Sequence, residues 1–286
     1  MVVPVVAAGT ALRRDGDASA GGRSARLSWR RIRAWRGIVL GLTGIFFLLP
    51  LYAALRFALE NNLGHLTLAA FSAIPHTTGF IPAFLLSVRL AAVTMAITMA
   101  LIVPTTIYVH VKYPKLLVAF DAITFLPVGI PPIVLIIGVL QSAPFVLKST
   151  PYLLALEYVI LAMPFAYRSL DAGLRAIDLK TLVDASRSLG GSWLATLWRV
   201  IVPNLRSAFL SAMILTLALV FGEFTMASLD LYTTLPVWVV NTDSITAHVS
   251  VAVSFLSLAL TWVLLLALSS VDRRRFARRA LIVEGT

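Results

Sequence analysis

The residues that most often carry bond-making chemistry are few in this sequence, and they are scattered. Cysteine is absent, which excludes thiol nucleophiles, disulfides and cysteine-held metal ions. The four histidines, at positions 65, 76, 110 and 248, form no cluster, and neither H-E-x-x-H nor G-x-S-x-G occurs. The phosphate-binding pattern G-x-x-x-x-G-K-[ST] is also missing, so we expect this chain not to hydrolyse ATP. We therefore expect no catalytic residue, no metal site and no bound cofactor.

The ionisable residues of interest lie inside or beside long apolar runs instead. They are Arg89, Glu157 and Glu223, and all three are candidates to line a solute path. A carboxylate near the bilayer centre costs about 2.5–3.5 kcal/mol on insertion scales, so it faces protein or water. For Glu223, a structural contact with Arg89 or with a backbone N–H is an equally good explanation. We expect Arg89 either to snorkel to the interface or to lie at the start of a helix, and Glu157 to lie closer to the membrane interface.

The elements that must position these residues are membrane-spanning helices. Of the 286 residues, 59% are apolar and only 13% are charged, and the mean hydropathy is +0.91. Too few polar side chains are present to cover a soluble fold, and such hydrophobicity also excludes disorder. We expect an all-α polytopic membrane protein. About six apolar runs are long enough to cross a bilayer: 37–55, 90–109, 122–147, 149–167, 207–229 and 244–271.

The net charge of +11 is explained by the membrane topology and does not indicate a surface for nucleic acid. With the N-terminus inside, 21 of the 24 Lys and Arg fall on the inner side, whereas the outer loops hold only Lys148. This asymmetry follows the positive-inside rule and places both termini in the cytoplasm. We expect a basic, disordered extension over 1–36 that contacts anionic lipid, a transmembrane domain over 37–271 and a basic tail over 272–286.

One inner segment, 169–206, is too long and too patterned to be a simple connection. Asp178 is a predicted helix N-cap, and Gly190-Gly191 is a predicted helix end. Between them, positions 179, 182, 183, 186 and 189 form a helical stripe that is apolar apart from one serine. We expect Ser192 to cap a second short helix over 193–198 and Pro203 to stand at the entrance of the fifth span. The pattern fits either an amphipathic helix on the membrane surface or a docking element for a partner protein.

This segment resembles the "EAA" signature of permease subunits of binding-protein-dependent ABC importers. The signature reads Glu-Ala-Ala, three residues, Gly, nine residues, Ile-x-Leu-Pro. Here Asp184-Ala185-Ser186 is followed, at the same spacing, by Gly190 and by Val-Ile-Val-Pro ending at Pro203. Segment 163–170 is similar to the family's proline-containing approach to the signature, and 126–132 is similar to its proline-rich third helix. Segments 222–224 and 234–237 resemble the branch that takes up polyamines, iron(III), thiamine, phosphonate, sulfate and molybdate.

The resemblance implies a MetI-like, six-helix permease of a type I importer in the bacterial inner membrane. It implies three kinds of partner: two cytoplasmic ABC ATPases that bind the ATP and Mg²⁺, an extracytoplasmic binding protein, and a second permease, more often a different chain than a copy. The inner segment would enter a cleft of the ATPase. The residues implied in this coupling are Leu182, Val183, Asp184, Ala185, Ser186, Leu189, Gly190 and Pro203.

Two other functional classes compete with the importer. A membrane-embedded enzyme lacks its motifs here, and a secondary transporter should show inverted repeats and several intramembrane charges. Dependence on an ATPase distinguishes the secondary transporter from the importer. The outer loops carry Glu60, Asp230 and Asp243 against Lys148, which favours a cationic solute such as a polyamine. Iron(III), thiamine and phosphonate remain alternatives.

Overall fold

The computed structural model describes residues 18–60 and 64–283, and this part of the chain is helical without a β-strand. The all-α class expected from the sequence is therefore confirmed. Contacts within the chain define two units, one that ends at Arg56 and one that begins at Phe57.

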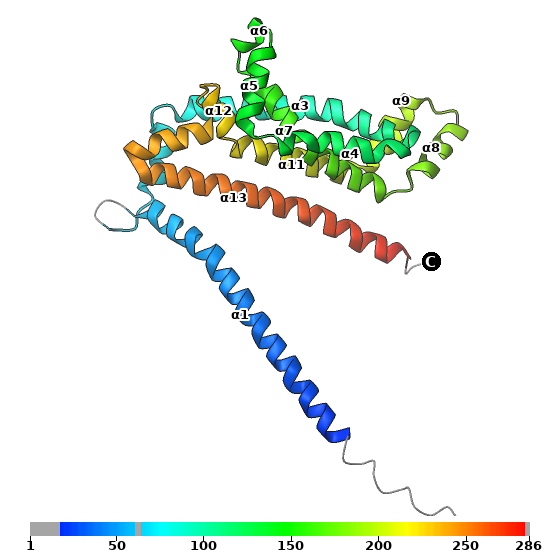
Figure 1. The fold of residues 1–286 in the computed structure, drawn as a ribbon, viewed down its shortest axis with the longest axis horizontal. Helices are drawn as coiled ribbons and strands as arrows, with labels where there is room; N and C mark the ends of the chain where they lie inside the picture. The colour runs from blue at the N-terminus through cyan, green and yellow to red at the C-terminus, as the bar shows by residue number, and fades with distance from the viewer. Residues whose placement is uncertain (1–17, 61–63, 284–286) are drawn as a thin grey trace, which may run out of the picture. The chain divides into compact units, whose positions relative to one another are not determined.

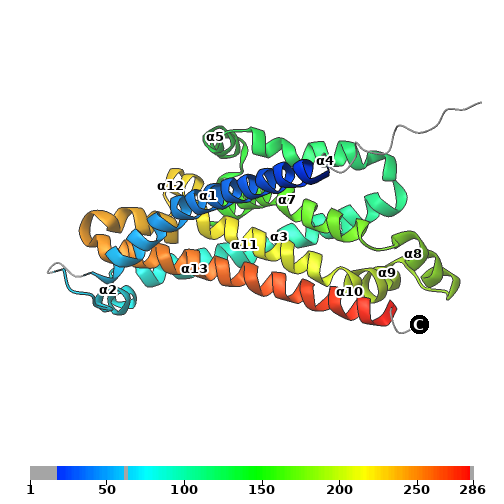
Figure 2. The same ribbon diagram turned by 90° about the horizontal axis from the view of Figure 1, so that it is seen from below.

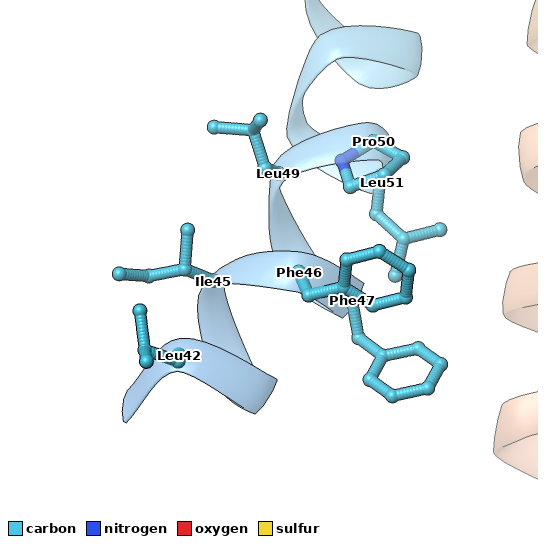
Figure 3. A pocket seen from close by; sticks show the side chains of 7 residues that line it. All are labelled: Leu42, Ile45, Phe46, Phe47, Leu49, Pro50 and Leu51. Atoms are coloured by element: carbon cyan, nitrogen blue, oxygen red, sulfur yellow. The ribbon is translucent and has the colours of Figure 1, made fainter. Parts of the chain in front are cut away.

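Helix α1, Ala18–Leu59, contains the described residues of the first unit (Figure 1). It includes 18–36, for which the sequence predicts disorder, whereas 1–17 lie outside the described residues. Its stretch Trp35–Leu59 is long and apolar enough to cross a membrane. Figure 3 shows a shallow hollow on this helix, lined by Leu42, Ile45, Phe46, Phe47, Leu49, Pro50 and Leu51. Side chains this apolar and this exposed require lipid or another protein around the helix.

Four long helices run side by side in the second unit (Figures 1 and 2). They are α3 (Phe80–Lys112), α7 (Tyr152–Arg175), α11 (Arg206–Gly222) and α13 (Leu235–Val283). Small residues let α7 approach its neighbours closely, since Ala155, Ala162 and Ala166 are fully buried. A Cβ on Gly173 of α7 would lie only 2.5 Å from the Cβ of Ala208 in α11. The core therefore follows α7, which is the central helix of the unit.

Shorter elements gather at the two ends of this bundle. One end carries α2 (Ala69–Ala73), the 3₁₀ turn η1 (Ile74–His76) and α12 (Thr225–Leu229). The opposite end carries α8 (Leu179–Ser188), α9 (Trp193–Thr196), the π-helical turn η4 (Leu197–Ile201) and α10 (Val202–Asn204).

The third apolar run of the sequence, 122–147, is long enough for one span with a loop attached, and the structure divides it among several short helices. The chain passes through η2 (Pro114–Leu116), α4 (Leu117–Phe125), η3 (Leu126–Gly129), α5 (Pro132–Ser142) and α6 (Phe145–Lys148). The two halves, Pro114–Gly129 and Pro132–Ser142, meet at 98°. Prolines cause this break, because Pro131 and Pro132 supply no N–H to a helix and Ile130 before them is extended. In Figure 1, α5 and α6 project from the bundle.

The fifth and sixth runs also differ from their predicted limits. Helix α11 ends at Gly222, and Glu223 is extended, so the predicted continuation of this span to residue 229 is wrong. Helix α13 begins at Leu235, nine residues before the predicted start of the sixth run at 244, and its backbone breaks at Thr246. Within the described residues, four helices are long and apolar enough to cross a membrane, or six spans if each of the two bent pairs counts as one. The chain is thus a multi-pass membrane protein.

Candidate functional site

The segment between α7 and α11 forms a compact hairpin at one end of the bundle. It consists of α8 and α9 joined by a tight turn, and we call residues 179–196 the loop hairpin (Figures 1 and 2). The turn η4 and helix α10 connect it to α11, which begins after a bend of 75°. The helix predicted between Asp178 and Gly190 is confirmed as α8. The second predicted helix, 193–198, is divided between α9 and η4.

Both helices of the hairpin begin at the side-chain caps that the sequence predicts. The Asp178 carboxylate accepts hydrogen bonds from the Thr181 N–H (3.2 Å) and the Thr181 hydroxyl (2.7 Å). These bonds favour the ionised form and lower the pKa of Asp178 below its ordinary value. The Ser192 hydroxyl accepts from the Ala195 N–H at 3.3 Å and starts α9 in the same way.

The two glycines of the turn serve different purposes. Gly190 has φ +79°, in the left-handed region that favours glycine. Gly191 is instead required by close approach, because a Cβ there would lie 2.8 Å from the Ser186 carbonyl oxygen. Gly191 was not among the predicted coupling residues, and only the Gly-Gly pair itself signals its role.

A hydroxyl pair joins the two helices across this turn. Ser186 Oγ and Thr196 Oγ1 lie 2.7 Å apart, and Thr196 is fully buried. The Thr196 hydroxyl also donates to the Ser192 carbonyl at 3.0 Å. Because a hydroxyl carries one hydrogen, Ser186 must be the donor of the pair. The predicted coupling residue Ser186 therefore closes the hairpin internally.

One face of the hairpin belongs to the core of the bundle. Val183 is only 4% exposed and packs in one cluster with Leu197, Ile201 and Leu205. The same cluster continues into the spanning helices through Ile107, Tyr167, Leu170, Leu174 and Ala208. Val183 thus anchors the hairpin to its own chain, rather than filling a partner's groove as the resemblance implies.

Three apolar side chains in and beside the hairpin are exposed. Leu189 is 89% exposed, and Leu194 and Trp198 are 65% and 63% exposed. Asp184, Ala185 and Pro203 are exposed as well, and Leu182 is half-buried. Sequence reasoning missed Leu194 and Trp198, although their i, i+4 spacing places both on one helix face. An open apolar tip on a buried base is suited to contact another protein.

The predicted path residues lie at the opposite end of the bundle, and two of them come together. The Glu223 carboxylate accepts from the N–H groups of Met226 (2.9 Å) and Ala227 (3.3 Å), so it caps α12. The sequence allowed a contact of Glu223 with Arg89 or with a backbone N–H, and the structure contains the backbone contact. Arg89 is exposed on α3, and the described ion pairs do not link it to Glu223.

Glu157 and Asp230 complete a cluster with Glu223 that the sequence did not connect. Glu157 is fully buried on α7, and Asp230 follows α12. Helix α12 packs against α7, and the carboxyl groups of Glu157, Asp230 and Glu223 are near enough to act on one another electrostatically. We call Glu157, Glu223 and Asp230 the acidic cluster. Within the described chain, His, Asp and Glu side chains form no group arranged to hold a metal ion.

Comparison with solved structures identifies the architecture. No protein-family model matches this sequence, and no curated protein matches it. The chain is similar to the crystal structure of an amino acid ABC transporter with histidines, with a TM-score of 0.50 and 18% identity. The match covers 73% of this chain and all of the other chain. The chain therefore shares the fold of the matched chain of that transporter. At this identity the likeness shows the fold alone, and the solute of that transporter is a property of that protein.

Proposed function

We propose that this chain is the permease subunit of an ATP-driven ABC importer, and that its loop hairpin docks on a cytoplasmic ATPase. The observation that carries the proposal is the construction of the hairpin: an exposed apolar tip at Leu189 and Leu194 stands on a base shared with the spanning helices. A push on the tip is transmitted through Val183 to α7 and α11, because packed side chains move together rather than deform. The ABC transporter fold and the EAA-like spacing support the same assignment.

The partners follow from this proposal. Two ABC ATPases supply the ATP and Mg²⁺ sites, since the sequence has no phosphate-binding pattern of its own. A second permease, a different chain, completes the path, and an extracytoplasmic binding protein delivers the solute. The complex lies in the bacterial inner membrane, with both termini of this chain, the hairpin and most Lys and Arg in the cytoplasm.

The solute we propose is small and cationic, such as a polyamine. The support is the excess of carboxylates at the end of the bundle opposite the hairpin, where Glu60 and Asp230 lie. An anionic entrance concentrates cations and repels anions. Iron(III), thiamine and an amino acid are the competing solutes, and phosphonate is disfavoured by the same charge.

Reconstitution tests the proposed function directly. The chain is placed in proteoliposomes with each candidate permease, ATPase and binding protein from its gene neighbourhood, and uptake of labelled solutes is followed. We expect uptake that requires ATP and disappears when the phosphate-binding lysine of the ATPase is replaced. Uptake by this chain without an ATPase would instead identify a secondary transporter.

A further inference from the structure

Two of the three carboxyl groups in the acidic cluster are buried without a group that neutralises them. Glu157 is fully buried, and both of its carboxyl oxygens lack a hydrogen-bond donor in the described structure. The two oxygens of Asp230 are buried and lack a donor as well. None of the ion pairs in the described residues includes a member of the cluster. Two buried, facing carboxylates without a cation or donor repel each other strongly when both are ionised.

Glu223 differs from the other two members because it has donors. Two backbone N–H groups of α12 bind its oxygens, so it can keep a negative charge. The hydroxyl of Tyr158 is buried without a hydrogen-bond partner, and Glu223 acts on it electrostatically. A tyrosine hydroxyl can donate to that carboxylate. The charge of Glu223 adds to the repulsion felt by Glu157 and Asp230.

The other groups around the pair offer no compensating charge. Tyr232 is acted on by Asp230 and is neutral at ordinary pH. Helix α5, which packs on α12, carries no ionisable residue. The nearest cations on other packed elements, Arg89 of α3 and Lys148 of α6, are exposed. A single proton placed between Glu157 and Asp230 supplies the missing donor and removes one of the two charges.

We propose that Glu157 and Asp230 share one proton and form a pH-sensitive latch between α7 and the connection from α12 to α13. In the latched state one carboxyl donates to the other. Removal of the proton leaves two facing anions, and the connection at Asp230, which is the partly exposed member, separates from α7. No second reactant is involved, because the proton is exchanged with water.

The direction of the pH dependence follows from burial. Burial raises the pKa of Asp230 above its ordinary value, so the folded protein binds a proton that the unfolded chain has already released. The latch is therefore complete at acidic pH and weakens as pH rises through the folded-state pKa. If the proposed orientation is correct, the latch faces the outside and responds to external pH; the shared proton itself does not depend on that orientation.

Infrared spectroscopy of the purified full chain in lipid nanodiscs tests the shared proton without an ATPase or a solute. At neutral pH we expect a C=O band of a protonated carboxyl that is lost on alkaline titration. In Glu157→Gln the band should be absent at neutral pH, because the amide donates to Asp230 in place of the proton. Asp184→Asn, which removes an exposed carboxylate at the hairpin, should leave the band unchanged.

Thermal unfolding supplies a second readout. Wild-type Tm should fall on going to alkaline pH, whereas Glu157→Gln should lose most of that fall while it keeps the acidic Tm. The shared proton is refuted if the band is missing at neutral pH, or if it persists in both Glu157→Gln and Asp230→Asn. It is also refuted if added Na⁺ or Ca²⁺ raises wild-type Tm but not that of Glu157→Gln, because the pair then holds a metal cation.

Discussion

Ser186 Oγ donates a hydrogen bond to Thr196 Oγ1 over 2.7 Å and so closes the loop hairpin across its glycine turn. Position 186 is the one at which the EAA signature has its second alanine. The departure from the signature therefore has a structural consequence, since a hydroxyl at this position ties α8 to α9 where an alanine could not.

Removing this bond should loosen the hairpin without preventing membrane insertion. We expect Ser186→Ala to cost about 0.5–1.5 kcal/mol of local stability, the usual net value of one hydrogen bond. ATP-driven uptake should fall, and exchange of the backbone amides over 186–196 should become faster. Ser188→Ala is the matched control, because the Ser188 hydroxyl donates only to the Asp184 carbonyl within its own helix. Equal exchange rates in the two variants would contradict the role of the pair.

The two glycines of the turn should respond differently to alanine. Gly190→Ala forces a left-handed residue to carry a Cβ, at a cost of roughly 1–2 kcal/mol. Gly191→Ala is expected to be worse for coupling, because its Cβ meets the Ser186 carbonyl oxygen and displaces the hydroxyl pair. The ratio of ATP hydrolysed to solute transported measures this effect. Gly138→Ala, at a glycine with nothing within 4 Å, should leave the ratio unchanged.

Variants of Glu223 distinguish a helix cap from a solute contact. Glu223→Gln retains one oxygen that can accept from α12, whereas Glu223→Ala retains none. We expect Gln to preserve most of the uptake and Ala to lose it together with protection of the α12 amides. Equal loss in Gln and Ala, with α12 protected in both, would show that the charge acts on the solute instead.

The start of α8 should depend on pH through Asp178. Its folded-state pKa is lowered by Thr181, so the cap contributes above the unfolded pKa and is lost as pH falls through the lower, folded value. Amide protection of α8 should therefore persist in mild acid and disappear below the usual aspartate range. In Asp178→Asn, which cannot ionise, that acid transition should be absent.

Local signals in the sequence predicted the hairpin well because its determinants are near each other in the chain. Asp178, Ser192 and Gly190 act within three or four residues, and all three have the predicted roles. The inward packing of Val183 could not be predicted, because the apolar stripe of α8 does not indicate which of its residues contact the helices of the same chain. The partner of Ser186 lies ten residues away, across a turn whose direction the sequence does not specify.

The acidic cluster was beyond sequence reasoning for a related reason. Glu157 and Asp230 are 73 positions apart, and their meeting depends on the end of α11 at Gly222. The apolar run predicted that this span continues past Glu223, so it did not indicate that a new short helix begins there. Hydropathy reports the length of an apolar segment, but not where its backbone turns.

Cross-linking tests the docking of the hairpin most directly, because the natural chain has no cysteine. Leu189→Cys places one thiol on the hairpin tip, and Val146→Cys places one on the exposed surface of α6 as a control. Each variant is co-expressed in membranes with single-cysteine forms of the candidate ATPase and treated with a bifunctional maleimide. The proposed coupling predicts that Leu189→Cys is joined to the ATPase and that Val146→Cys is not. Cross-linking of the ATPase at position 146 but not at 189 would contradict it.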